Sequence, residues 1–125
     1  MKTGILFVVL MFLALSCKDP ATDPPAMIKY EVLTAEGNWY GEYISETGER
    51  ICFCAPPLPP SGWTYSFIVK KKPFTLHIDA TSDCACITQT YSPDVTANIY
   101  VDNKLVATNT SNWAPGLASA DYVVK

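Results

Sequence analysis

Apolar and polar residues alternate along most of the chain from Met27 onward. The alternation is clearest in three stretches, at 63–69, 74–80 and 95–101. A period of two places alternate side chains on the same face of a β-strand, and no window outside residues 1–16 has the spacing of an amphipathic helix. The pattern therefore predicts an all-β protein.

Turn residues such as Thr47-Gly48 and Asp102-Asn103 divide this part of the chain into short strands. Because each strand has one apolar face, two sheets must pack together. The expected fold is an antiparallel immunoglobulin-like β-sandwich, with a small closed barrel as the alternative. The predicted strands are 28–34, 38–45, 50–55, 63–69, 74–80, 84–91, 95–102, 104–110 and 117–124.

Residues 1–16 follow a different pattern, in which Lys2 precedes an unbroken apolar run from Ile5 to Leu15. A membrane-spanning helix needs roughly 20 apolar residues, and this run is shorter. A basic start, a short apolar run and small residues at its end are typical of an export signal. We therefore expect residues 1–16 to be a signal peptide, with a retained membrane anchor as an alternative.

The end of this signal, Ala14-Leu15-Ser16-Cys17, resembles the lipobox of bacterial lipoproteins, in which the cysteine is acylated and becomes the mature N-terminus. The position three before the cysteine is usually leucine, and Ala14-x-Ser16 also suits the signal peptidase that releases soluble proteins. The chain has five cysteines, so acylation of Cys17 leaves an even number for pairing, whereas soluble release leaves an odd thiol. The resemblance implies a covalent lipid on Cys17 and attachment to the outer membrane.

Residues 17–26 are rich in proline and poor in apolar side chains, which predicts an extended tether. At about 3.1 Å per residue, the nine residues from Lys18 to Ala26 would hold a domain up to roughly 28 Å from the lipid. Cys17-Lys18-Asp19 is similar to the start of Bacteroidota lipoproteins that are displayed on the cell surface. Those proteins usually carry two adjacent acidic residues, whereas Asp19 is followed only by Asp23. Surface display is expected, with the periplasmic face as the alternative.

Residues 27–125 have the length of one small domain. The formal net charge is −3, and the only cluster of basic residues is Lys70-Lys71-Lys72. We expect this triplet to form an exposed turn, with contact to anionic lipid or polysaccharide as the alternative. Nucleic acid is not an expected partner, because its phosphates bind a basic face that the sequence lacks.

Two stretches near the C-terminus, Asn98 to Val106 and Gly116 to Val123, resemble the end of small β-sandwich domains in Bacteroidota lipoproteins. Those domains are similar in turn to a family of small mycobacterial membrane proteins that accompany lipid- and siderophore-exporting transporters. The shared features are a hairpin and a final strand of small residues. Since such features serve sandwich packing, the resemblance supports a fold rather than an activity.

Four cysteines follow Cys17, as Cys52-Phe53-Cys54 and Cys84-Ala85-Cys86. Side chains two apart on a strand share a face but lie too far apart for ordinary disulfide geometry, so we expect bridges between the two pairs, in either register. A loop of about 30 residues closed in this way would stabilise the fold by roughly 3–4 kcal/mol. The alternatives are a tetrathiolate zinc or copper site and a redox-active disulfide, and the one-residue spacing is unusual for both.

The sequence contains no recognisable catalytic arrangement. His77 is the only histidine, lies on the polar side of a predicted strand, and has no serine or cysteine at a motif spacing. We expect it, together with the carboxylates of Asp79, Asp83, Asp94 and Asp102, to be an ordinary surface group. Neither enzymatic activity nor a metal is expected, and the lipid is the only expected non-protein group.

Candidate binding residues lie in the loops. A proline-rich connection at 55–62 leads into Trp63, and Trp113 lies in the loop 111–116. An exposed tryptophan offers a flat apolar surface to a sugar or a protein, although inward packing is the alternative. We therefore expect a non-catalytic binding or accessory protein of the cell envelope, whose partner is an unidentified envelope protein or glycan. The alternatives are a carbohydrate-binding surface lipoprotein and a thiolate metal-binding lipoprotein.

Overall fold

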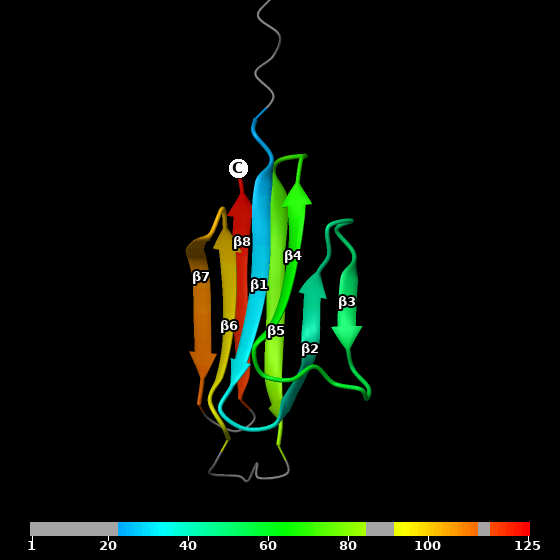
Figure 1. Ribbon diagram of the computed structural model, residues 1–125, viewed down its shortest axis with the longest axis vertical. Helices are drawn as coiled ribbons and strands as arrows, with labels where there is room; N and C mark the ends of the chain where they lie inside the picture. The colour runs from blue at the N-terminus through cyan, green and yellow to red at the C-terminus, as the bar shows by residue number, and fades with distance from the viewer. Residues whose placement is uncertain (1–22, 85–91, 113–115) are drawn as a thin grey trace, which may run out of the picture.

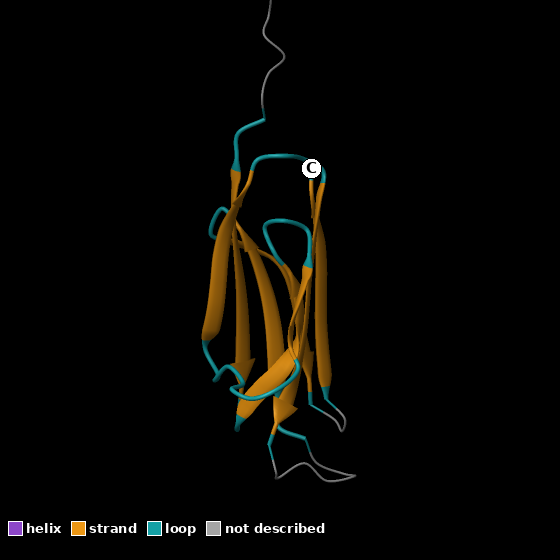
Figure 2. Ribbon diagram, turned by 90° about the vertical axis from the view of Figure 1, so that its right-hand side faces the viewer, coloured by secondary structure: helices purple, strands orange, loops and turns teal. Residues whose placement is uncertain are grey.

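The computed structural model describes residues 23–84, 92–112 and 116–125. These residues form eight strands and no helix, in two antiparallel four-stranded sheets that pack face to face (Figures 1 and 2). The expectation of an antiparallel β-sandwich is confirmed, and the two sheets do not close into a barrel. The described part of the chain has no helix that could cross a membrane.

The first sheet has the order β4-β1-β6-β7, and the second has the order β3-β2-β5-β8. The first sheet contains β1 (Ala26–Thr34), β4 (Trp63–Val69), β6 (Val95–Val101) and β7 (Lys104–Ser111). The second contains β2 (Asn38–Ile44), β3 (Arg50–Phe53), β5 (Phe74–Asp83) and β8 (Leu117–Val124).

Six of the strands follow the immunoglobulin strand order. The adjacent pair β4-β1 corresponds to strands E and B, and β3-β2-β5-β8 corresponds to C′, C, F and G. The β6–β7 hairpin pairs with β1 at the place that strand A takes in an immunoglobulin domain. The sandwich is therefore immunoglobulin-like in its centre and differs at one edge.

Eight of the nine predicted strands correspond to observed strands, and the ninth, 84–91, lies outside the described residues except for Cys84. The ends of the other strands shift by a few residues, most of all in β5, which continues to Asp83. Cys84 lies outside any strand, and 85–91 lie outside the described residues. The lysine triplet forms the predicted connection between β4 and β5, and Lys70 and Lys71 are exposed.

The alternating apolar residues form the core between the sheets. On β1, Ile28, Tyr30 and Val32 are fully buried, and Leu76 and Ile78 of β5 are buried in the facing sheet. Each such side chain contributes about 1.5–3 kcal/mol when it is removed from water. The alternation therefore accounts for both the strand faces and the packing of the two layers.

The described N-terminal segment and the C-terminus lie at the same end of the sandwich (Figure 1). The register agrees, because Ala26 pairs with Val69 and Phe74 pairs with Val124 at this end. The connection that contains Lys70 and Lys71 joins β4 to β5 there. We call it the tether end, and the proline-rich connection between β3 and β4 lies at the opposite, distal end.

Candidate functional site

A cluster of polar side chains lies on the outer face of the second sheet, away from the core. It consists of Glu42 on β2, His77 and Asp79 on β5, and Asp121 on β8. Antiparallel pairing places Glu42 opposite Asp79 and His77 opposite Asp121, and His77 and Asp79 share a face because they are two apart. We call these residues the His77 cluster.

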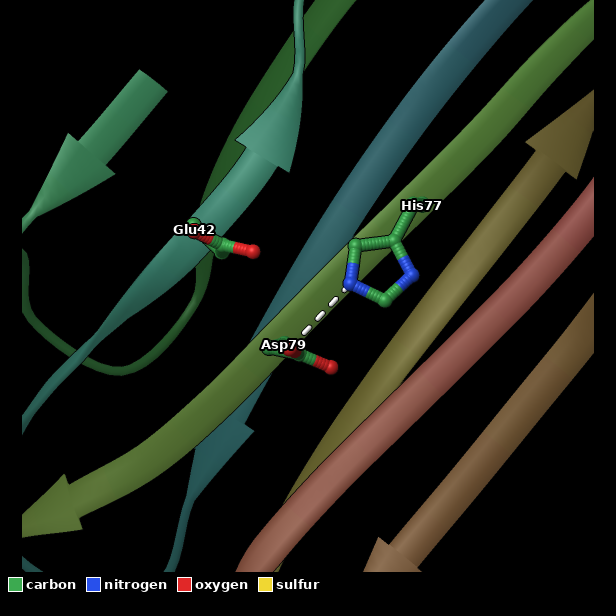
Figure 3. A group of neighbouring side chains, drawn as sticks. All are labelled: Glu42, His77 and Asp79. Atoms are coloured by element: carbon green, nitrogen blue, oxygen red, sulfur yellow. Dashed lines mark ion pairs between the residues drawn. The ribbon is translucent and has the colours of Figure 1, made fainter. Parts of the chain in front are cut away.

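His77 lies between two carboxylates. Its Nδ1 donates a hydrogen bond to Oδ1 of Asp121 at 2.6 Å, and its Nε2 lies 3.1 Å from Oδ2 of Asp79, as Figure 3 shows for the latter pair. The imidazole is only 16% exposed, because strands flank it on both sides. Both ring nitrogens are therefore engaged by acceptors.

These contacts raise the pKa of His77 above the ordinary histidine value of 6.5. Desolvation by itself lowers the pKa, but the hydrogen bonds to Asp121 and Asp79 and their negative charges outweigh it. The ring is therefore stabilised as an imidazolium that bridges β5 and β8.

Glu42 reaches from β2 toward the two residues on β5 (Figure 3). Ligand-type atoms of Glu42, His77 and Asp79 all lie within 4.8 Å of one another. Glu42 also forms an ion pair with Arg50 of β3, whose side chain is 65% exposed. Within the described residues, Oδ1 of Asp79 is buried and has no hydrogen-bond partner. The cluster thus combines an imidazole with carboxylates, the donors that bind zinc and similar cations.

A glycine brings β2 and β5 close together beside this cluster. Gly41 has a φ of +155°, and a Cβ atom built on it would lie 2.0 Å from the backbone oxygen of Asp79. No other residue type fits without a shift of the backbone. The close approach positions Glu42, the next residue, above Asp79.

Cys52 and Cys54 are disulfide-bonded as predicted, but the structure joins them to each other and not to the second pair. The Cα atoms of the two residues lie 5.3 Å apart, within the ordinary range for disulfides, since β3 ends at Phe53 and the chain turns there. Moreover, β2 lies between β3 and β5 in the sheet. The expected bridges from Cys52 or Cys54 to the second pair assumed adjacent strands, and β3 and β5 are not adjacent.

The second pair is described only in part. Cys84 is disulfide-bonded, its Sγ lies 3.7 Å from Oε2 of Glu36, and Cys86 lies outside the described residues. A sulfur in a disulfide is not a thiolate, so Cys52 and Cys54 are not metal ligands in this oxidised form.

The candidate binding tryptophan of the described chain packs inward. Trp63, the first residue of β4, is partly buried against the core, with ring centroids 5.1 Å from Trp39 and 5.3 Å from Tyr43. Trp39 itself is fully buried. Trp113 and Cys17 lie outside the described residues. Of the predicted lipidation and binding residues, the described structure therefore places Trp63.

Comparison with known proteins adds no family to this description. No family model matches the chain, and no curated protein matches it at the significance required of a relative.

Proposed function

We propose that this protein is a non-catalytic binding or accessory domain that a lipid on Cys17 anchors to a bacterial outer membrane, where it is displayed on the cell surface. The observation that carries the proposal is the lipobox-like Ala14-Leu15-Ser16-Cys17, followed by a proline-rich tether. The described end of that tether enters an independently packed sandwich at Ala26. Anchor, spacer and folded domain therefore follow one another along the chain.

The arrangement of the domain agrees with such an anchor. The tether enters at the same end as Lys70 and Lys71, and Lys72 and Lys125 line a hollow there together with Asp102. Lysines near an anionic membrane surface gain about 1 kcal/mol each. An anchored domain would turn these side chains toward the lipid and leave its distal end free for a partner.

Metabolic labelling with an alkyne fatty acid tests the anchor. The wild-type chain should carry the label and sediment with outer membranes, whereas Cys17→Ser should lose the label because no thiol remains for acylation. The double variant Cys52→Ser/Cys54→Ser is the matched control, since it also removes cysteines and should remain labelled. Brief protease treatment of intact cells should then cleave the wild-type chain if it is displayed at the surface.

A wild-type chain without label would contradict the proposal, as would equal labelling of Cys17→Ser. Labelling together with full protection from protease in intact cells would keep the anchor and place the domain on the periplasmic face instead.

A further inference from the structure

We propose that Glu42, His77 and Asp79 bind one divalent transition-metal ion, for which Zn²⁺ fits the donor set best. The three residues offer one imidazole nitrogen and two carboxylate oxygens, from two neighbouring strands. Three protein ligands with a remaining position for water or a further ligand are typical of open zinc sites. The site does not depend on the lipid anchor and goes beyond the proposed function.

The hydrogen bond between His77 and Asp121 supports a metal on the other ring nitrogen. In metal sites, the histidine that binds through one nitrogen usually donates the other ring N–H to a carboxylate, which fixes the orientation of the ring. Here Nδ1 donates to Asp121 at 2.6 Å, and Nε2 faces Asp79. Asp121 is therefore a positioning residue, and Nε2 is the ligand atom; the ion takes the place of its proton, which is released.

The distances require only small side-chain movements. Zinc bonds of about 2.0–2.1 Å to nitrogen and oxygen place tetrahedral ligand atoms about 3.3 Å apart. Nε2 of His77 and Oδ2 of Asp79 are already 3.1 Å apart. The ligand atoms of all three residues lie within 4.8 Å, and Glu42, with its rotatable side chain, can move closer.

The polar groups of the cluster also gain from an ion. Oδ1 of Asp79 is buried without a hydrogen-bond partner in the described structure, and a cation beside this carboxylate would compensate its lost solvation. Glu42 would exchange its ion pair with Arg50 for the metal. Loss of that ion pair should cost little, because Arg50 is exposed and surface ion pairs contribute little to stability.

Titration of the full chain with ZnCl₂ tests the site. The protein is purified in detergent without a histidine tag, treated with chelator and titrated in competition with a chromophoric zinc indicator. We expect one equivalent of Zn²⁺ per chain. His77→Ala and Glu42→Gln should each weaken binding at least tenfold, and Asp121→Asn should weaken it about 10–100-fold by releasing the ring.

Asp83→Asn is the matched control, because it neutralises a carboxylate on the same strand outside the cluster and should leave the affinity unchanged. Glu42→Gln alters β2 and leaves β5 intact, so it also tests the site if the His77 variant fails to fold. Circular dichroism identifies such a failure.

Nuclear magnetic resonance of the wild-type chain gives a second readout that needs no variant. His77 is the only histidine, so its imidazole signals are unambiguous. Zinc should shift the Nε2 resonance and leave Nδ1 protonated. Binding without a change at His77, no stoichiometric binding, tighter binding of Ca²⁺ than of Zn²⁺, or unchanged affinity in both ligand variants would overturn the proposal.

Discussion

Tyr30 combines a fully buried ring with a hydroxyl group that donates a hydrogen bond to the backbone oxygen of Ile44 at 2.9 Å. Burial is the largest cause that raises the pKa of Tyr30 above its ordinary value of 10. The side chain therefore joins the two sheets only while it remains neutral.

Stability should fall at alkaline pH because of this tyrosine. Below pH of about 10 the phenol is neutral in both states, and its contribution is fully present. At higher pH the unfolded chain releases the proton while the folded chain keeps it, so the free energy of unfolding falls by about 1.4 kcal/mol per pH unit for this group. Urea unfolding between pH 8 and 11 measures the slope.

Tyr30→Phe is the comparison for this slope. This variant should lower the free energy of unfolding by about 1 kcal/mol at neutral pH, because the hydrogen bond is lost. At alkaline pH its free energy of unfolding should fall less steeply than that of the wild-type chain, because one ionising group is missing. Equal slopes in both proteins would mean that Tyr30 ionises normally in the fold.

Gly41 gives a second prediction for a single residue. Gly41→Ala should lower the free energy of unfolding by at least about 2 kcal/mol, because the new Cβ would meet the backbone oxygen of Asp79. Gly48→Ala is the control: it has a positive φ of +82° but nothing within 4 Å, so it should show only the backbone cost of about 1 kcal/mol. Chemical denaturation of both variants measures the difference, and equal losses would contradict the close approach.

At the scale of elements, β3 is a short edge strand that carries a disulfide immediately at its end. The bond between Cys52 and Cys54 closes a loop with a sequence separation of only 2. A loop this small removes little freedom from the unfolded chain. Its contribution in the chain-entropy model is about 1.6 kcal/mol, smaller than that of a bridge over a long loop.

The replacement Cys52→Ser/Cys54→Ser should therefore lower the free energy of unfolding by about 2 kcal/mol or less. The pairing itself can be read from a tryptic digest without reductant. Cleavage at Arg50 and Lys70 should release 51–70 as a separate peptide that gains two hydrogens on reduction. If peptide 51–70 is instead linked to the peptide that contains Cys84, the observed pairing is contradicted.

The strands could be predicted from the sequence because each buries one face and exposes the other. The same rule predicts a β5 that is too short, because the last residues of this strand are polar. Ser82 is fully buried, and its hydroxyl donates to the backbone oxygen of Glu36 at 3.0 Å, so a serine takes an inward position that alternation assigns to apolar residues. Hydrogen bonding to a distant loop is not visible in a local pattern.

The His77 cluster could be predicted only in part. His77 and Asp79 lie two apart in the sequence, so their shared face was visible. Glu42 and Asp121 come to them through the strand order β2-β5-β8 and its register, which pairs distant segments. Turn lengths and alternation do not determine which strands become neighbours, and the cluster was therefore missed.

At the scale of the whole molecule, the two long edges of the sandwich differ. At one edge, β7 and β8 of the two sheets lie against each other, and the backbone N–H of Ser119 donates to Asn109 at 3.3 Å. Toward the other edge, aromatic rings fill the space between the sheets, with Phe53 5.5 Å and Tyr65 6.2 Å from Trp63. The aromatic residues thus serve the closure of the sandwich, and Trp63 takes part in it from the first position of β4.

The position of β1 also affects how the domain responds to mechanical load. The described N-terminal segment leads directly into β1 at Ala26, and β1 pairs with β4 on one side and with β6 on the other. A force applied through this N-terminal segment to a domain held at its distal end acts along β1. It therefore loads the hydrogen bonds of two ladders in shear, all at the same time, instead of opening them one after another. A domain built in this way resists extraction by pulling at its N-terminal end.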